Sequence, residues 1–231
     1  MSEPFEAPAR ALVIAAHPDD AEFGCGGTIA RWTAAGARVQ VLVLTSGDKG
    51  SHDPSANPLE LAARREAEQR AAAEALGVEA VHFLRLLDGE VEPTLALRAR
   101  LCLLVRQLAP EVVVTHDPWR LYQLHPDHRA TGLVASDAVI AARDHLFFPE
   151  QLTGTLRHHR ARAIWYFTTD HPNMWVDVGA AIAQKVAALR AHASQVAHLD
   201  DLEERVRQRA RQMGESRGLE YAEEFHRVEL S

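Results

Sequence analysis

The stretch of sequence that decides the fold is ALVIAAHPDDAEFGCGG, residues 11–27. Its first six residues, 11–16, form a continuous apolar run, which is typical of a strand covered on both faces. One histidine and three carboxylates follow at once, and then a cluster of glycines. In an α/β protein this is the place where a strand turns into a helix. The polar residues are therefore expected beyond the carboxyl end of that strand, where such proteins bind ligands.

Working outward from this stretch, the pattern of the chain alternates between strands and helices. Asn57-Pro58-Leu59-Glu60 has the form of a helix start, with an asparagine N-cap, a proline at the first position and a glutamate that completes a capping box. We expect strands at 11–16, 38–47, 81–87, 111–117, 161–169 and 174–178. We expect helices at 26–36, 58–76, 94–108, 126–143, 181–195 and 201–213.

This alternation predicts an α/β fold with a mainly parallel sheet, because strands joined by helices form right-handed crossovers. The simplest strand order is 3-2-1-4 plus the late strands. Strands 1 and 4 are then neighbours whose connections leave in opposite directions, and ligands bind at such a switch point. No internal repeat or clean linker interrupts the chain, so we expect one domain over residues 1–231.

Composition narrows the class of protein. The net charge of −7 argues against nucleic acid or an anionic membrane as the main partner, because both require a basic surface. No apolar stretch approaches the roughly 20 residues of a membrane span. The beginning, MSEPFEAPAR, lacks the basic and apolar regions of a secretory signal, so we expect a cytoplasmic protein. The two cysteines, Cys25 and Cys102, are expected to be reduced.

A second His-Pro-Asp occurs in HPDHRATG, residues 125–132, directly after the fourth predicted strand. Pro126 suits the first turn of a helix, which makes His125 its N-cap. Two imidazoles and one carboxylate on converging loops make a zinc site with an open position for water, although they would also hold other divalent ions. Of the adjacent Asp19 and Asp20, one would bind the metal and the other stay free as a base. The alternative is that these carboxylates and Glu22 only cap a helix.

These residues carry a resemblance to a known family. AHPDDAEFGCGG and HPDHRATG together resemble the signatures of the PIG-L/LmbE family of zinc-dependent N-deacetylases. Weaker matches extend the resemblance over nearly the whole chain: TSGDKG (45–50), the helix at 65–78, LLDGE (86–90) and HASQ (192–195). The resemblance implies a Rossmann-like three-layer sandwich and hydrolysis of an N-acetyl group from a small amino sugar, glycoconjugate or related amide. Members of the family commonly associate, so it also favours a homo-oligomer.

The resemblance also implies roles for the residues of the two motifs. His17, Asp20 and His128 correspond to ligands of Zn²⁺ or of another divalent metal. Asp19 corresponds to the general base that takes a proton from the zinc-bound water, and His125 to the group that stabilises the oxyanion. Whether Asp19 or His125 protonates the departing amine stays open.

Other positions are expected around this centre. We interpret Asp127 as a carboxylate that orients an imidazole. By resemblance, Arg65 and Asp88 correspond to contacts with substrate hydroxyls, while the alternative for Arg65 is an exposed charge paired with Glu68. His116 and His192 are candidates for supporting or pocket-rim positions. The loops 48–57 and 145–160 are expected to shape the mouth of the pocket.

One departure from the family pattern leaves a role open. Some relatives carry a tyrosine two residues before the first histidine of HPDH, where this chain has Gln123, and Tyr122 is one step further away. A tyrosine contribution to the oxyanion site therefore stays open in this chain.

Two other functions compete with the deacetylase. Gly24, Gly26 and Gly27 follow the first strand, as in a dinucleotide-binding oxidoreductase. That fingerprint, however, needs glycines directly at the strand end and an acidic residue closing the second strand, and a carboxylate-rich turn would repel a pyrophosphate. The second competitor is a catalytically idle relative that binds a metal or ligand on the same fold.

Overall fold

The apolar run of the decisive stretch forms β1 (Arg10–Ala15), whose residues are buried from Ala11 onward. The computed structural model describes residues 6–230, so the beginning of the chain, from which we predicted the absence of a secretory signal, lies partly outside the described residues. β1 belongs to a seven-stranded sheet of order β3-β2-β1-β4-β5-β7-β6. This order confirms the predicted 3-2-1-4 arrangement with late strands added beyond it.

Four of the six strand pairs are parallel, and β7 is antiparallel to both of its neighbours. The other strands are β2 (Arg38–Thr45), β3 (Ala80–Leu86), β4 (Val112–His116), β5 (Ala163–Phe167), β6 (Met174–Asp177) and β7 (Ala222–Glu229). The helices are α1 (Asp20–Ala34), α2 (Pro58–Ala75), α3 (Leu95–Leu108), α4 (Pro126–Ala142), α5 (Ile182–Ala191), α6 (Ala193–Val196) and α7 (Leu202–Glu215). Short 3₁₀ turns occupy Pro149–Gln151 and Gly179–Ala181.

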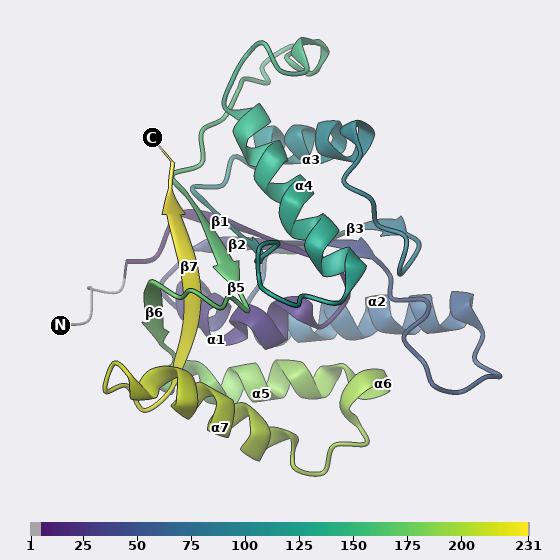
Figure 1. Ribbon diagram of the computed structural model, residues 1–231, viewed down its shortest axis with the longest axis vertical. Helices are drawn as coiled ribbons and strands as arrows, with labels where there is room; N and C mark the ends of the chain where they lie inside the picture. Colours follow the sequence, from purple (N-terminus) through teal and green to yellow (C-terminus); the bar gives the residue numbers. More distant parts are fainter. Residues whose placement is uncertain (1–5, 231) are drawn as a thin grey trace.

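The sheet lies between two layers of helices (Figure 1). Successive side chains of a strand point to opposite faces, so Val13 of β1 packs into one core and Leu12 and Ile14 into the other. The first core contains residues of α1, α2, α5 and α7, and the second contains residues of α3 and α4. Among the described helices, none combines the length and the apolar character that a membrane span needs.

The predicted helix starts that carry polar N-caps are confirmed. The Asn57 side chain accepts a hydrogen bond from the backbone N–H of Leu59 at 2.9 Å, and His125 accepts one from the backbone N–H of Asp127 at 3.3 Å. Helix α1 differs from its prediction, because it begins at Asp20 rather than at residue 26 and includes a kink at Cys25, where φ is −148°. Its first turn therefore contains the acidic residues of the decisive stretch.

The glycines of α1 allow other side chains to pack closely against the helix. A Cβ at Gly24 would lie 2.6 Å from the Phe167 ring, and a Cβ at Gly27 would lie 2.8 Å from Val178. These contacts fill the space in front of the glycines with protein side chains. This packing speaks against the dinucleotide-binding alternative, in which glycines leave room for a pyrophosphate.

The sequence did not predict β7, which lies between β5 and β6. Its residues, AEEFHRVE, lack a regular alternation of apolar and polar side chains. One of them, Glu223, is buried and pairs with the buried Lys185 of α5 at 2.6 Å. Glu223 also accepts hydrogen bonds from the backbone N–H groups of Gly27 and Thr28, at 2.8 and 2.7 Å. This carboxylate therefore ties β7 to the part of α1 that follows the kink.

We predict that Lys185→Met lowers the free energy of unfolding by about 3–5 kcal/mol, because it leaves Glu223 as an uncompensated buried charge. Arg190→Ala is the control, since the Arg190–Glu203 pair is exposed and its loss costs at most about 1 kcal/mol. Urea unfolding of the two variants measures both values. Equal losses would contradict a structural role for the buried pair.

Candidate metal centre and active site

The two His-Pro-Asp motifs meet because β1 and β4 are adjacent parallel strands, with Ile14 paired to Thr115. His17 follows the end of β1, and His128 lies in the first turn of α4, the helix that follows β4. The Nδ1 atom of His17 lies 3.3 Å from the Nε2 atom of His128. The structure therefore brings together side chains that are 111 positions apart in the chain.

The carboxylate of Asp20 lies against both histidines, with one oxygen toward each ring, and we call these three side chains the donor triangle. The Oδ2 atom of Asp20 lies 3.4 Å from His17 Nδ1, and its Oδ1 atom lies 3.2 Å from His128 Nε2. In a tetrahedral zinc site with bonds of about 2.0–2.2 Å, neighbouring ligand atoms lie about 3.3–3.5 Å apart. The three predicted ligands thus have the spacing and the chemistry that suit a small divalent cation.

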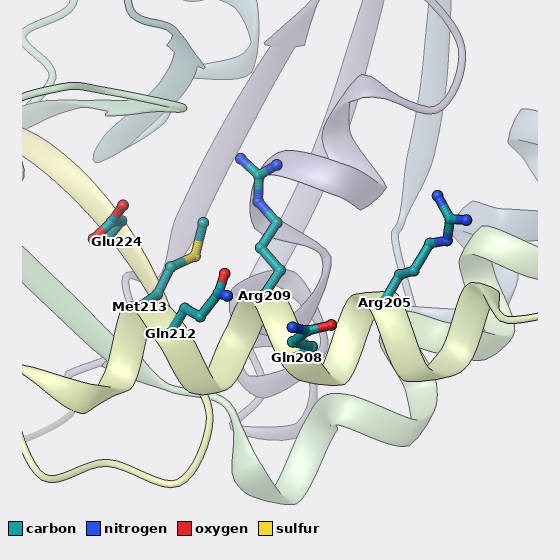
Figure 2. Close-up of a pocket in the computed structure, with 6 residues that line it drawn as sticks. All are labelled: Arg205, Gln208, Arg209, Gln212, Met213 and Glu224. Carbon is teal, nitrogen blue, oxygen red and sulfur yellow. The ribbon is translucent and has the colours of Figure 1, made fainter.

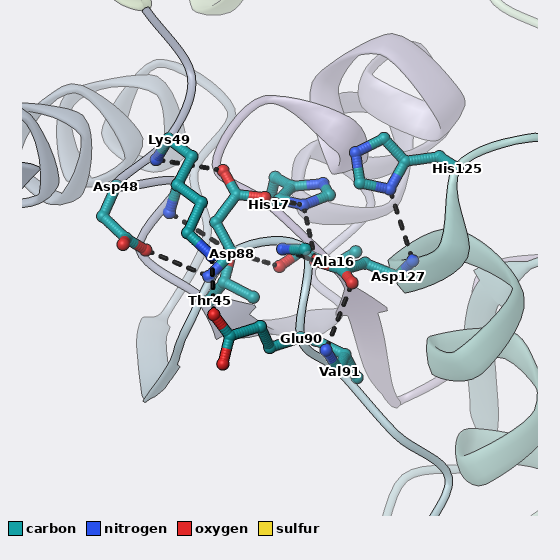
Figure 3. A network of polar contacts seen from close by, with 12 residues as sticks. Ala16, His17, Thr45, Asp48, Lys49, Asp88, Glu90, Val91, His125 and Asp127 are labelled. Carbon is teal, nitrogen blue, oxygen red and sulfur yellow. Dashed lines mark hydrogen bonds and ion pairs between the residues drawn. The ribbon is translucent and has the colours of Figure 1, made fainter.

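The other nitrogen of the His17 ring faces two carboxylates (Figure 3). Its Nε2 atom lies 3.0 Å from Asp88 Oδ1 and 3.1 Å from Asp127 Oδ2. Asp127 is fully buried and also accepts hydrogen bonds from the backbone N–H groups of Gly89 and Val91, so its carboxylate is held in place. A carboxylate behind a histidine is the usual device that orients the ring and turns its other nitrogen toward a metal.

The charges around His17 favour a cation at this point. Burial alone would lower the pKa of His17, but hydrogen bonds to Asp127, Asp20 and Asp88 raise it to about 12. Burial likewise works against the charged form of Asp20, yet the charge of His116 and the hydrogen bonds of three histidines hold its pKa well below the usual range. Carboxylates are in excess around this ring, and a bound divalent ion would balance their charge.

Asp19 adopts a backbone conformation that is rare for a residue other than glycine, with φ of 98°. It is the N-cap residue of α1, but its side chain makes no capping hydrogen bond, so the interpretation of Asp19 as a simple helix cap is wrong. Its carboxylate is largely buried and lies 3.3 Å from Nη2 of Arg65. Burial and the charge of Asp20 raise the pKa of Asp19 to about 7, and the charge of Arg65 opposes this rise.

The side chain of Arg65, on α2, packs against the turn that contains Asp19. It is 4% exposed and donates hydrogen bonds to the carbonyl oxygens of Pro18 at 2.7 Å and Gly47 at 3.1 Å. The alternative interpretation, an exposed charge paired with Glu68, is therefore wrong. The predicted contacts of Arg65 and Asp88 with substrate hydroxyls stay predictions, because the contacts seen here are with the protein itself.

His125 stands at the other side of the donor triangle. Its ring is stacked on that of His128, with 4.6 Å between the centroids, and lies edge-on to that of His17. Its Nδ1 atom accepts the N–H of Asp127, which assigns the ring proton of the neutral form to Nε2. Burial and the nearby charges of His17 and His128 lower the pKa of His125. The neutral ring, with one N–H donor, is thus the favoured form.

A cavity of about 300 Å³ opens directly at the donor triangle. Asp20, His116, His125 and His128 line this cavity, and the remaining lining residues are Phe23, Gly24, Arg120, Gln123, Phe167, Thr168 and Arg209. The loops 48–57 and 145–160, which we expected at the pocket mouth, contribute no residue to this lining. Tyr122 is 83% exposed and does not line the cavity either.

A second cavity, of about 540 Å³, runs along α7 and shares Arg209 with the first. Its lining is polar, and Figure 2 shows the side chains side by side along the helix: Arg205, Gln208, Arg209, Gln212 and Met213, with Glu224 from β7. The sequence analysis missed Arg209, since nothing in the pattern of α7 distinguishes it from the other arginines of that helix.

The sequence named two candidates for residues that support the donor triangle, His116 and His192, and the structure places only His116 there. His116, a predicted candidate, lies with its Nε2 atom 3.1 Å from Asp20 Oδ2, so it holds the second oxygen of that carboxylate. His192, the other candidate, is fully buried and lies 3.3 Å from Glu22. His192 therefore lies next to Glu22 of α1 and does not line the cavity.

Residues 12–139, more than half of the chain, match the PIG-L family, described as GlcNAc-PI de-N-acetylase. The chain belongs to this family. It is 37% identical over 195 residues to diacetylchitobiose deacetylase of Thermococcus kodakarensis, an alignment that covers 84% of this chain and 73% of that protein. It is 32% identical to the 1D-myo-inositol 2-acetamido-2-deoxy-alpha-D-glucopyranoside deacetylase of Mycolicibacterium gilvum, with 81% of each chain covered.

Solved structures agree with this assignment. The N,N'-diacetylchitobiose deacetylase of Pyrococcus horikoshii, solved with an inhibitor, superposes with a TM-score of 0.91 at 33% identity, covering 98% of this chain and 86% of that one. The 4-carboxy-2-hydroxymuconate hydratase of Pseudomonas putida superposes with a TM-score of 0.82 at 25% identity, covering 96% of this chain and 97% of that one. These findings confirm the resemblance stated from the motifs and the three-layer fold that it implies.

We predict that His17→Ala abolishes stoichiometric binding of zinc, and that Asp127→Asn weakens it by about 10- to 100-fold because the His17 ring loses the carboxylate that orients it. His82→Ala is the control, since His82 lies on β3 and bonds to Gln40, away from the donor triangle. Competition with a chromophoric chelator measures the affinities. Unchanged affinity in Asp127→Asn would contradict the orienting role.

Proposed function

We propose that the protein is a zinc-dependent hydrolase that removes the N-acetyl group from an amino sugar. The observation that carries this proposal is the donor triangle of His17, Asp20 and His128 with a free carboxylate, Asp19, beside it. Three protein ligands of the N, N, O type are characteristic of catalytic zinc sites, which keep one position open. Membership of a de-N-acetylase family supports the same reaction.

A divalent ion held by the triangle would supply Lewis acidity, which lowers the pKa of water and polarises an amide carbonyl. Asp19 then acts as the base that takes the proton of the attacking water. Its raised pKa suits this task, because a base whose pKa is close to the working pH transfers protons most effectively. The hydrogen bonds from Arg65 to the Pro18 carbonyl oxygen and to the Asp19 carboxylate hold the base in place next to the ligand Asp20.

His125 supplies the hydrogen bond to the developing oxyanion. Since its Nδ1 atom is occupied by the N–H of Asp127, the neutral ring donates through Nε2, and no protonated imidazole is needed. A donor fixed at the N-terminus of α4 costs little reorganisation when charge develops on the substrate. Asp19, which then carries the proton taken from the water, returns it to the departing amine, because the neutral His125 ring has no proton to give beyond the N–H that stabilises the oxyanion.

The cavity dimensions indicate a small substrate with an extension. A volume of about 300 Å³ is at the lower end of ligand pockets and suits one N-acetylated sugar ring. The polar cavity along α7 begins at Arg209 and would receive the remainder of a disaccharide or glycoconjugate. Diacetylchitobiose, the substrate in the names of two relatives, has this form. The homo-oligomer favoured by the resemblance stays a prediction.

The proposal is tested by measuring acetate release from N-acetylglucosamine, diacetylchitobiose and N-acetylglucosaminyl glycoconjugates after zinc reconstitution. We expect zinc-dependent release of one acetate per reacting sugar, and loss of activity on treatment with a chelator. A protein that binds zinc stoichiometrically and releases acetate from none of these compounds would favour the idle metal-binding relative instead.

Asp19→Asn is the matched variant for this assay. It removes the base but keeps the size of the side chain, so turnover should fall by about 10²- to 10⁴-fold while bound zinc stays stoichiometric. Normal turnover in Asp19→Asn would show that Asp19 is not the base. Zinc content, measured on the same samples, separates loss of the base from loss of the metal.

Arg209→Ala tests the extension along α7. We expect KM for diacetylchitobiose to rise by about 10-fold and kcat to stay unchanged, because the lost contact binds substrate and transition state equally. KM for the monosaccharide N-acetylglucosamine should rise much less, because Arg209 is only one of the residues that line the first cavity. Arg211→Ala, on the same helix but hydrogen-bonded to Tyr221, is the control. An equal change for both substrates would contradict a subsite along α7.

A further inference from the structure

The strained turn at Asp19 is stabilised by one specific hydrogen bond. A positive φ of 98° persists in a residue with a side chain only where the surroundings hold it. The backbone N–H of Asp19 donates to Oε1 of Gln69, at 3.0 Å. Gln69 lies on α2, fifty positions along the chain, and its side chain is fully buried. The mechanism above does not use this residue.

The orientation of the Gln69 amide is matched by its second hydrogen-bond partner, Glu22. The Nε2 atom of Gln69 donates to Oε1 of Glu22 at 2.7 Å, and Glu22 is fully buried as well. The backbone N–H of Asp19 can only donate, so the oxygen of the amide must face Asp19, and its NH₂ group then faces Glu22. The second oxygen of Glu22 lies 3.3 Å from Nε2 of the buried His192, without a hydrogen bond between them.

The hydrogen bond has a consequence for the carboxylate of Asp19. An aspartate at an N-cap position normally has an extended backbone, and its side chain accepts a hydrogen bond from the N–H groups of the first helical turn. Asp19 occupies the N-cap of α1 without doing so. Gln69 pins its N–H in the left-handed conformation from one side, and Arg65 contacts its carboxylate at 3.3 Å from the other. The side chain of Asp19 can therefore either cap α1 or act as the base, but it cannot do both.

We propose that Gln69 and Glu22 are positioning residues that withhold Asp19 from helix capping and direct its carboxylate to the reacting water. Glu22 orients the amide of Gln69, and the oxygen of that amide holds the Asp19 backbone. This inference rests on the proposed function, in which Asp19 is the base. It assigns a task to Gln69 and Glu22, neither of which lines the cavity.

Gln69→Met tests the hydrogen bond, because methionine has nearly the same length and no strong acceptor. We expect kcat to fall by about 10- to 100-fold, the range that misplacement of a catalytic group produces. KM should stay within about twofold, and bound zinc should stay stoichiometric, since the donor triangle is unchanged. In a crystal structure of the variant, Asp19 should adopt an extended backbone, with its carboxylate on the first turn of α1.

Leu76→Ala is the control for loss of stability. Leu76 is buried in the apolar core directly after α2 and takes no part in the polar network. Both variants are compared by Tm and by kcat measured well below the lower Tm. A structural role predicts equal kcat at equal loss of Tm, whereas the positioning role predicts a loss of kcat in Gln69→Met alone.

Exchanging the side chains of Gln69 and Glu22 tests the same hydrogen bond by restoring it. This test does not require the protein to tolerate a cavity at position 69. Gln69→Glu alone places two carboxylates 2.7 Å apart, and kcat should fall as in Gln69→Met. The double variant Gln69→Glu/Glu22→Gln restores a donor opposite the carboxylate at position 69, which again accepts the N–H of Asp19. We expect kcat to return to within about threefold of the original value.

The outcomes separate this inference from the proposed function. If the original protein releases no acetate from any sugar, the proposed function is wrong. If it does, and Gln69→Met turns over no more slowly than Leu76→Ala, or the double variant stays as slow as Gln69→Glu, Gln69 is structural and the positioning role is refuted.

Discussion

The parallel pairing of β1 with β4 is the constraint on which the rest of this molecule depends. Because Ile14 lies beside Thr115, the chain leaves both strands at the same edge of the sheet and in opposite directions. His17 and His128 then reach the same point from the ends of neighbouring strands. A residue inserted into either strand would move one imidazole by about 3.3 Å along the sheet and separate the donor atoms. The candidate metal centre therefore depends on strand register as much as on side-chain type.

The adjacency of the two strand ends brings several carboxylates close together, and the protein must stabilise their negative charge. Asp20, Asp88 and Asp127 all lie within hydrogen-bond distance of one histidine. Each is stabilised by groups fixed on rigid elements: Asp127 by the backbone of residues 89–91, Asp88 by the N–H of Lys49, and Asp20 by three imidazoles. The arrangement is preorganised for a cation. The same concentration of charge acts on Asp19, whose pKa is raised by burial and by the charge of Asp20 in spite of the nearby Arg65.

The sequence predicted those parts of the fold and site that depend on local pattern. Alternating strands and helices imply the 3-2-1-4 order, and the N-caps Asn57 and His125 follow from proline at the next position. The strand β7 was missed because its residues carry no alternation, and its place is set by pairing with β5 and β6. Gln69 was missed because it lies in REAEQRAAAEA, where polar residues occur on every side of the helix. Only the three-dimensional packing of α2 against the turn at Asp19 shows that this glutamine is buried.

The fold alone does not determine the reaction, since a hydratase superposes on this chain with a TM-score of 0.82. Both hydration of a double bond and hydrolysis of an amide need water and a base, so the donor triangle by itself does not separate them. The difference must lie in the groups that receive charge from the substrate. Here the neutral His125 presents one N–H at the N-terminus of α4, where the helix dipole adds positive potential. Such a donor is suited to the oxyanion of a tetrahedral amide adduct. His125 and its hydrogen bond to the helix backbone are therefore the features of this site that bear most directly on the proposed hydrolysis of an amide.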